Sequence, residues 1–64
     1  MKHPANYTIE EFREKFSDIP YEIVDIVYGY YHRDKSYSVE IYARSKHISV
    51  ATLYRYVRRL NRRL

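Results

Sequence analysis

The apolar residues of this chain recur three or four positions apart, which is the spacing of one face of an α-helix. Ile9, Phe12 and Phe16 follow this spacing near the start of the chain. Near its end the same spacing runs through Leu53, Val57, Leu60 and Leu64. No segment alternates apolar and polar residues with the period of two that a half-buried strand shows. The pattern therefore predicts an all-α fold, a four-helix domain without a sheet.

Three of the expected helices begin at side-chain caps. Thr8 and Glu11 form a capping box, in which each side chain accepts the other residue's backbone amide. Ser38 and Ser49 stand immediately before two further stretches with helical apolar spacing. Each serine hydroxyl can cap its helix by accepting a backbone amide of the first turn. The ranges predicted for these three helices are residues 8–17, 39–46 and 49–63.

The remaining helix is expected to be the central one. Asp18 and Pro20 supply a capping acid and a proline that fits a first helical turn, which predicts a helix over residues 19–33. This segment is apolar on most sides, so we expect it to be the most buried. Gly29 costs about 1 kcal/mol in a helix interior relative to alanine. We interpret it as a packing glycine that lets another helix approach closely.

Residues 38–60 meet the requirements of two helices that cross at a tight turn. Ala43 stands where a helix-turn-helix motif has the small residue that allows its helices to cross closely, and Ile48, five positions later, stands where the motif has the buried aliphatic that closes the turn. Ser49 opens the second helix. His47 stands where such turns usually have glycine, and histidine is among the residues that tolerate positive φ. On these residues the segment resembles the helix-turn-helix of prokaryotic transcription regulators.

A longer stretch carries a related resemblance. Residues 19–64, a buried helix followed by a helix-turn-helix with an arginine-rich second helix, are similar to region 4 of bacterial sigma factors. They also resemble the helix-turn-helix of Mga-type winged-helix regulators. The chain ends where the β-hairpin of a winged helix would begin, so we expect no wing.

The resemblance implies that the second helix of the motif lies in the major groove of double-stranded DNA. Arg55 is the leading candidate for a base contact, because a guanidinium can hold guanine with two hydrogen bonds. The residues expected to contact bases are Val50, Ala51, Tyr54, Arg55 and Arg58. The residues expected to contact phosphates are Ser49, Thr52, Arg44, Lys46, Arg59, Arg62 and Arg63.

The charge of the chain is unevenly distributed, and this favours a polyanionic partner. Residues 1–32 carry three basic and six acidic side chains, whereas residues 33–64 carry nine basic and two acidic ones. The net charges of these halves are therefore −3 and +7. The last predicted helix has five arginines and no acidic residue. Like charges on one helix repel each other, and a partner of opposite charge removes that cost.

Fold-internal explanations for the same residues remain open. Arg58 and Arg59 could pair with the acidic half, through Glu10, Glu11 or Asp25. Arg62 and Arg63 could fray at the end of the last helix. Tyr54 could pack on the first helix, Tyr42 is expected in the core, and the tyrosine-rich central helix is expected to be buried rather than to form a dimer surface.

Composition argues against catalysis, metal binding and a cofactor. The chain has no cysteine and a single glycine, so it lacks thiolate ligands and a glycine-rich phosphate loop. Its three histidines, His3, His32 and His47, are far apart and show no metal-ligand spacing. No apolar run approaches the roughly 20 residues that span a bilayer. We expect a cytoplasmic protein that is not an enzyme and has no membrane partner.

Two functions from different classes follow from these features. The first is a small DNA-binding transcription regulator, or an excision (recombination directionality) factor of a phage or mobile element, acting on DNA as a homodimer. The alternative is a protein-interaction module that docks on or inhibits a partner such as RNA polymerase or an integrase. DNA binding would weaken steeply with salt and depend on Arg55, whereas a protein interface would depend more on exposed tyrosines.

Overall fold

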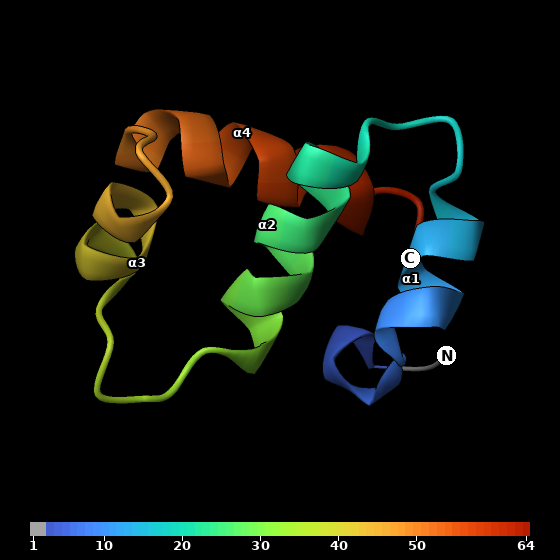
Figure 1. Ribbon diagram of the computed structural model, residues 1–64, viewed down its shortest axis with the longest axis horizontal. Coiled ribbons are helices and arrows are strands. Elements are labelled where there is room, and N and C mark those ends of the chain that lie inside the picture. The colour runs from blue at the N-terminus through green and yellow to red at the C-terminus, as the bar shows by residue number, and fades with distance from the viewer. Residues whose placement is uncertain (1–2) are drawn as a thin grey trace.

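The computed structural model describes residues 3–64 and is all-helical within them (Figure 1). No strand occurs in this range, so the predicted all-α, four-helix architecture is confirmed. A single 3-10 turn, η1, precedes the four α-helices. The elements are η1 (Pro4–Asn6), α1 (Ile9–Lys15), α2 (Tyr21–His32), α3 (Val39–Ser45) and α4 (Val50–Asn61).

The predicted helices extend one or two residues too far at most of their ends. The predicted ranges were 8–17, 19–33, 39–46 and 49–63. At the N-termini of α1 and α4, the extra residue in the predicted range is the N-cap. Its side chain accepts a helix amide, but its own backbone angles are extended, so it does not belong to the helix. At the C-termini the chain leaves the helix to make the packing turns described below.

Three caps form as predicted from the sequence, at Thr8, Ser38 and Ser49. The Thr8 amide donates to Glu11 Oε1 at 2.9 Å, and the Glu11 amide donates to Thr8 Oγ1 at 3.1 Å, which completes the capping box of α1. Ser38 Oγ accepts the Ile41 amide at 3.2 Å at the start of α3. These contacts satisfy helix amides that would otherwise lack an acceptor.

The predicted start of α2 is wrong. Pro20 is the N-cap rather than a first-turn residue, and no side chain caps the helix. The reason is the burial of Ile19, which is 3 % exposed, in the core. Residues 16–19 form a tight turn that directs the Ile19 side chain into the core. In this turn the Ile19 amide donates to the Phe16 carbonyl at 3.0 Å. The Asp18 carboxylate is left outside the helix and binds Arg63 instead.

The core consists of two clusters that α4 connects. One lies between α1, α2 and the end of α4, and the other between α2, α3 and the start of α4. In Figure 1 α2 lies between α1 and α3, while α4 runs across one end of this group. Val57 packs against both clusters, so the apolar seam of α4 joins them. The buried side chains are Phe12, Phe16, Ile19, Val24, Val27 and Leu60 in the first cluster, and Tyr42, Ala43 and Leu53 in the second.

Gly29 is a packing glycine, as expected. The Tyr42 ring of α3 lies over it, and a Cβ at position 29 would meet the Tyr42 hydroxyl oxygen directly. That hydroxyl donates to the Ile26 carbonyl of α2 at 2.6 Å. Burial raises the pKa of Tyr42, which keeps the hydroxyl protonated as a donor. Tyr42 is only 7 % exposed and so belongs to the core, as predicted.

Candidate nucleic-acid interface

The turn between α3 and α4 is fixed by its backbone hydrogen bonds. His47 has φ 61°, the left-handed conformation that glycine usually supplies. The His47 amide donates to the Arg44 carbonyl at 3.0 Å, and the Ile48 amide donates to the Ala43 carbonyl at 3.1 Å. Together these two bonds form a Schellman motif, which ends a helix abruptly. Ile48 packs with Ala43 in the second core cluster, so the apolar contact that accompanies this motif is present.

Ser49 caps α4 and thereby orients its first turn. Ser49 Oγ accepts the Thr52 amide at 3.1 Å and donates its own proton to Thr52 Oγ1 at 2.9 Å. Both hydrogen-bonding functions of the serine hydroxyl are therefore used within the protein. The amides of Val50 and Ala51 precede the first helical hydrogen bond and remain directed out of the N-terminus of α4. A phosphate at this end would bind these amides rather than the Ser49 hydroxyl proton.

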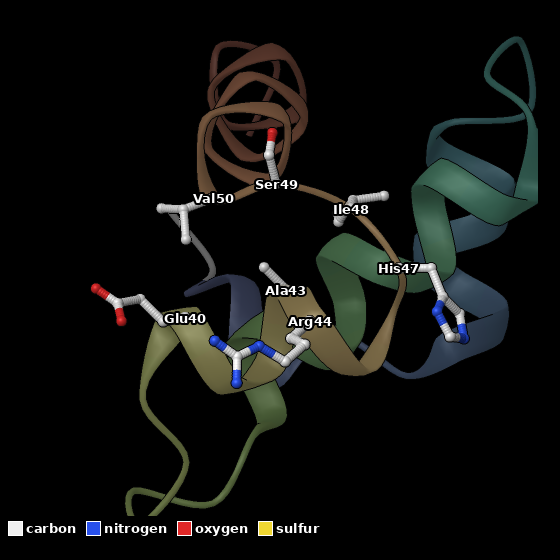
Figure 2. A pocket seen from close by; sticks show the side chains of 7 residues that line it. All are labelled: Glu40, Ala43, Arg44, His47, Ile48, Ser49 and Val50. Atoms are coloured by element: carbon white, nitrogen blue, oxygen red, sulfur yellow. The ribbon is translucent and has the colours of Figure 1, made fainter.

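A shallow groove lies along the turn, between α3 and the start of α4 (Figure 2). Arg44 extends its guanidinium along the open side of the groove, next to Glu40 one helical turn earlier. Val50 lines the opposite side but is half-buried, because it packs against the second core cluster. Of the two small residues predicted to contact bases, Ala51 is therefore the more accessible.

The exposed face of α4 is formed by arginine. Arg55, Arg58, Arg59 and Arg62 are all exposed and have the spacing i, i+3, i+4 and i+7; the first three lie in α4, and Arg62 is its C-cap with helical backbone angles. They line a common shallow hollow to which no other residue of the described range 3–64 contributes. Tyr54, 42 % exposed, lies at the edge of this face rather than packing on α1.

Arg13 and Arg63 each bind a carboxylate, which sets the α4 face apart from them. Arg13 holds Asp25 through two hydrogen bonds of 3.0 and 2.8 Å, and this contact raises the pKa of Arg13. Asp25 is therefore not the partner of Arg58 or Arg59. Neither of these two arginines takes part in the ion pairs found within residues 3–64.

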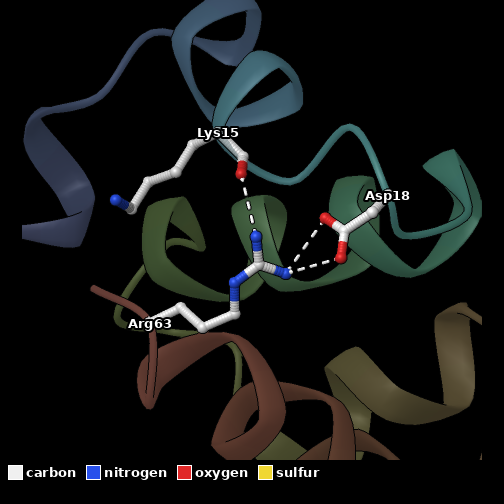
Figure 3. A network of polar contacts seen from close by, with 3 residues as sticks. All are labelled: Lys15, Asp18 and Arg63. Carbon is white, nitrogen blue, oxygen red and sulfur yellow. Dashed lines mark hydrogen bonds and ion pairs between the residues drawn. The ribbon is translucent and has the colours of Figure 1, made fainter.

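Arg63 is held by the protein rather than frayed (Figure 3). Its Nη1 atom lies 3.0 Å from both carboxylate oxygens of Asp18, and its Nη2 atom donates to the Lys15 carbonyl at 3.3 Å. The guanidinium also lies 5.1 Å from the centre of the Phe16 ring. The hydrogen bond from Arg63 lowers the pKa of Asp18 below its usual value. This clasp ties the end of α4 to the α1–α2 connection and removes Arg63 from the free cations predicted to contact phosphate.

The other predicted phosphate contacts lie beside the turn. Arg44 and Lys46 are exposed, and the Lys46 ammonium lies 5.6 Å from the centre of the Tyr42 ring. Thr52 is half-buried, with its amide and hydroxyl both bonded to Ser49. The structure thus brings Arg44, Lys46 and the start of α4 to one end of the molecule, with the arginine face continuing from there along α4.

One residue important for this arrangement was not singled out from the sequence. Arg33 ends α2, donating to the Tyr30 carbonyl at 2.8 Å and to the Tyr37 carbonyl at 3.2 Å. Its guanidinium lies 4.5 Å from the centre of the Tyr30 ring. These contacts hold the connection that leads into α3. An arginine in the last turn of a helix is a weak signal for such a role.

No protein-family model, curated protein or solved structure matches this chain. Within residues 3–64 no group of histidine and acidic side chains could hold a metal ion. None of the helices in that range is both long and apolar enough to cross a membrane.

Proposed function

We propose that this protein binds double-stranded DNA through α3, the turn and α4, and acts as a small transcription regulator or as an excision factor of a phage or mobile element. The observation that carries the proposal is the arginine face of α4, which has no carboxylate among the residues of its hollow and adjoins a rigid turn. Phosphate contacts supply most of the affinity of such interfaces, and a basic surface also speeds association.

The length of α4 divides its exposed face into two parts. Twelve residues extend for about 18 Å at 1.5 Å per residue, and the major groove is about 12 Å wide. With the N-terminal end in the groove, Ala51, Tyr54 and Arg55 reach base edges. Arg59 and Arg62 then lie beyond the groove and meet the phosphate backbone. Arg55 is the residue with the geometry to hold guanine through two hydrogen bonds.

The first test is fluorescence anisotropy with duplex DNA over a salt series. Three or four phosphate contacts give a slope of roughly −3 in log K against log salt, so affinity should fall roughly 40- to 150-fold between 50 and 200 mM salt. Arg55→Ala should lose discrimination between duplex sequences. Lys35→Ala, which removes the same charge from an exposed loop residue, should retain that discrimination. Absence of binding at low salt by a folded sample contradicts the proposal.

A second candidate function, docking on a protein partner such as RNA polymerase or an integrase, is favoured by a separate surface. Tyr37 and Ile41 are 54 % and 50 % exposed, and both line a pocket at the start of α3. Ile41→Ser should abolish binding to immobilised RNA polymerase while leaving duplex binding unchanged. An unchanged affinity for the polymerase excludes this surface as the docking site. The same variant in sedimentation experiments tests whether two copies associate there.

A further inference from the structure

Four arginines, three on α4 and one at its C-cap, line one surface hollow. Among residues 3–64, Arg55, Arg58, Arg59 and Arg62 line one hollow of about 180 Å³. At about 30 Å³ per water molecule this is room for roughly six waters, or for a small anion with part of its hydration shell. A guanidinium presents a rigid fork of donors that fits phosphate oxygens in pairs.

Helix stability does not explain this arrangement. Cations near the C-terminus of a helix interact favourably with its dipole, and this accounts for Arg58 and Arg59 in the last turn of α4. It does not account for Arg55 in the middle of the helix. Neighbours at i, i+3 and i+4 that carry the same charge repel each other, and each of these arginines has two such neighbours among the other three.

The ion pairs elsewhere in the structure show how this protein neutralises an arginine that it needs for folding. Arg13 and Arg63 each bind a carboxylate on another element. No carboxylate of the described part of the chain lines the α4 hollow, although the sequence has eight acidic residues. Asp18 attracts Arg59 without forming an ion pair with it, and the remaining positive charge of the hollow is left for a ligand from outside the fold.

We propose that the α4 hollow binds one compact, multiply charged phosphate group. Each backbone phosphate of DNA carries a single negative charge, whereas a phosphomonoester carries about −1.5 to −2 at pH 7 and so matches four guanidiniums better. A free pyrophosphate-type anion and the terminal phosphate of a nucleic-acid strand share this chemistry. The hollow lies on the face that we propose for DNA, so a phosphate bound in the hollow prevents the binding of duplex DNA. Only this competition rests on the proposed function.

The direct test is calorimetric titration of the whole chain with inorganic pyrophosphate at constant ionic strength. We expect saturable binding of one pyrophosphate per chain. Arg62→Ala should weaken it by at least about tenfold, because a charge-assisted contact is lost. Lys35→Ala, which lowers the net charge equally, should change it by less than about twofold. Circular dichroism of both variants verifies that they fold. An equal loss in the two variants, or no saturable binding, overturns the proposal.

Two further measurements separate this inference from DNA binding and identify the source of the phosphate. Pyrophosphate should displace duplex DNA from the wild type; duplex binding that saturating pyrophosphate leaves unchanged overturns the single-site inference while the proposed function stands. Pyrophosphate binding without any duplex binding overturns the proposed function, while the inference of a phosphate site on α4 stands. A single strand with a 5′-phosphate that binds more tightly than its 5′-hydroxyl counterpart supports the terminal phosphate as ligand, and equal binding supports a free polyphosphate.

Discussion

Substitution of Gly29 by alanine should destabilise the protein, although alanine is the better helix former. The site is in the interior of α2, where the exchange contributes about 1 kcal/mol in favour of the helix. The new methyl group would collide with the Tyr42 hydroxyl and lie 3.3 Å from Tyr42 Cζ. Moving the ring aside breaks the 2.6 Å hydrogen bond to the Ile26 carbonyl.

The magnitude follows from these opposing effects. Loss of the hydrogen bond costs about 1 kcal/mol. Overpacking of a well-packed site costs about 1 to 3 kcal/mol. The higher helix propensity of alanine offsets about 1 kcal/mol of these costs. Gly29→Ala should therefore lower the free energy of unfolding by about 1 to 3 kcal/mol. For a domain of this size each kcal/mol corresponds to about 4–8 °C in melting temperature.

A double-mutant cycle with Tyr42→Phe tests the cause. Phenylalanine lacks the colliding oxygen, so in that background Gly29→Ala should be neutral or stabilising by up to about 1 kcal/mol. The coupling energy between the two sites should be at least about 1 kcal/mol. Urea denaturation followed by far-ultraviolet circular dichroism measures all four proteins. A stabilising effect of Gly29→Ala in the wild-type background would refute the close contact between α2 and α3.

Two further predictions concern the turn and the clasp. His47→Gly should stabilise the protein by about 0.5–1 kcal/mol in thermal unfolding, because glycine adopts φ 61° without strain; His47→Ala, which keeps the strain, should give no such gain. Folding lowers the pKa of Asp18, chiefly through its hydrogen bond from Arg63. The clasp therefore stabilises the protein fully at pH values above the ordinary pKa of 3.8. This stabilisation is lost as the pH falls through the lower pKa of the folded protein. Asp18→Asn should remove that part of the acid dependence of the melting temperature, and an acid profile identical to wild type would contradict the role of the clasp.

Local signals allowed the helices and the turn to be predicted. The caps at Thr8, Ser38 and Ser49 each involve an amide three residues away, so that the sequence nearby contains both partners. His47 adopts positive φ as its position in the motif predicted. The arginine face of α4 could also be anticipated, since helical periodicity alone places residues at i, i+3, i+4 and i+7 on one side.

Contacts between distant segments could not be predicted in the same way. Asp18 looked like a helix cap, but its partner Arg63 is 45 residues away and meets it only after α4 packs across the other helices. The same packing decides that Arg63 is neutralised whereas Arg62, its neighbour in sequence, lines the open hollow. The sequence does not show that Arg63 has a carboxylate partner, because that contact depends on which element faces it.

The sequence by itself determined the all-α class, the caps, the left-handed turn residue and the charge of α4, because each depends on residues within about one helical turn of one another. Only the tertiary structure decided which charges are neutralised and that Tyr42 closes over Gly29. Those outcomes depend on how the two core clusters align α4 with α1, α2 and α3, and such packing involves residues that are far apart along the chain.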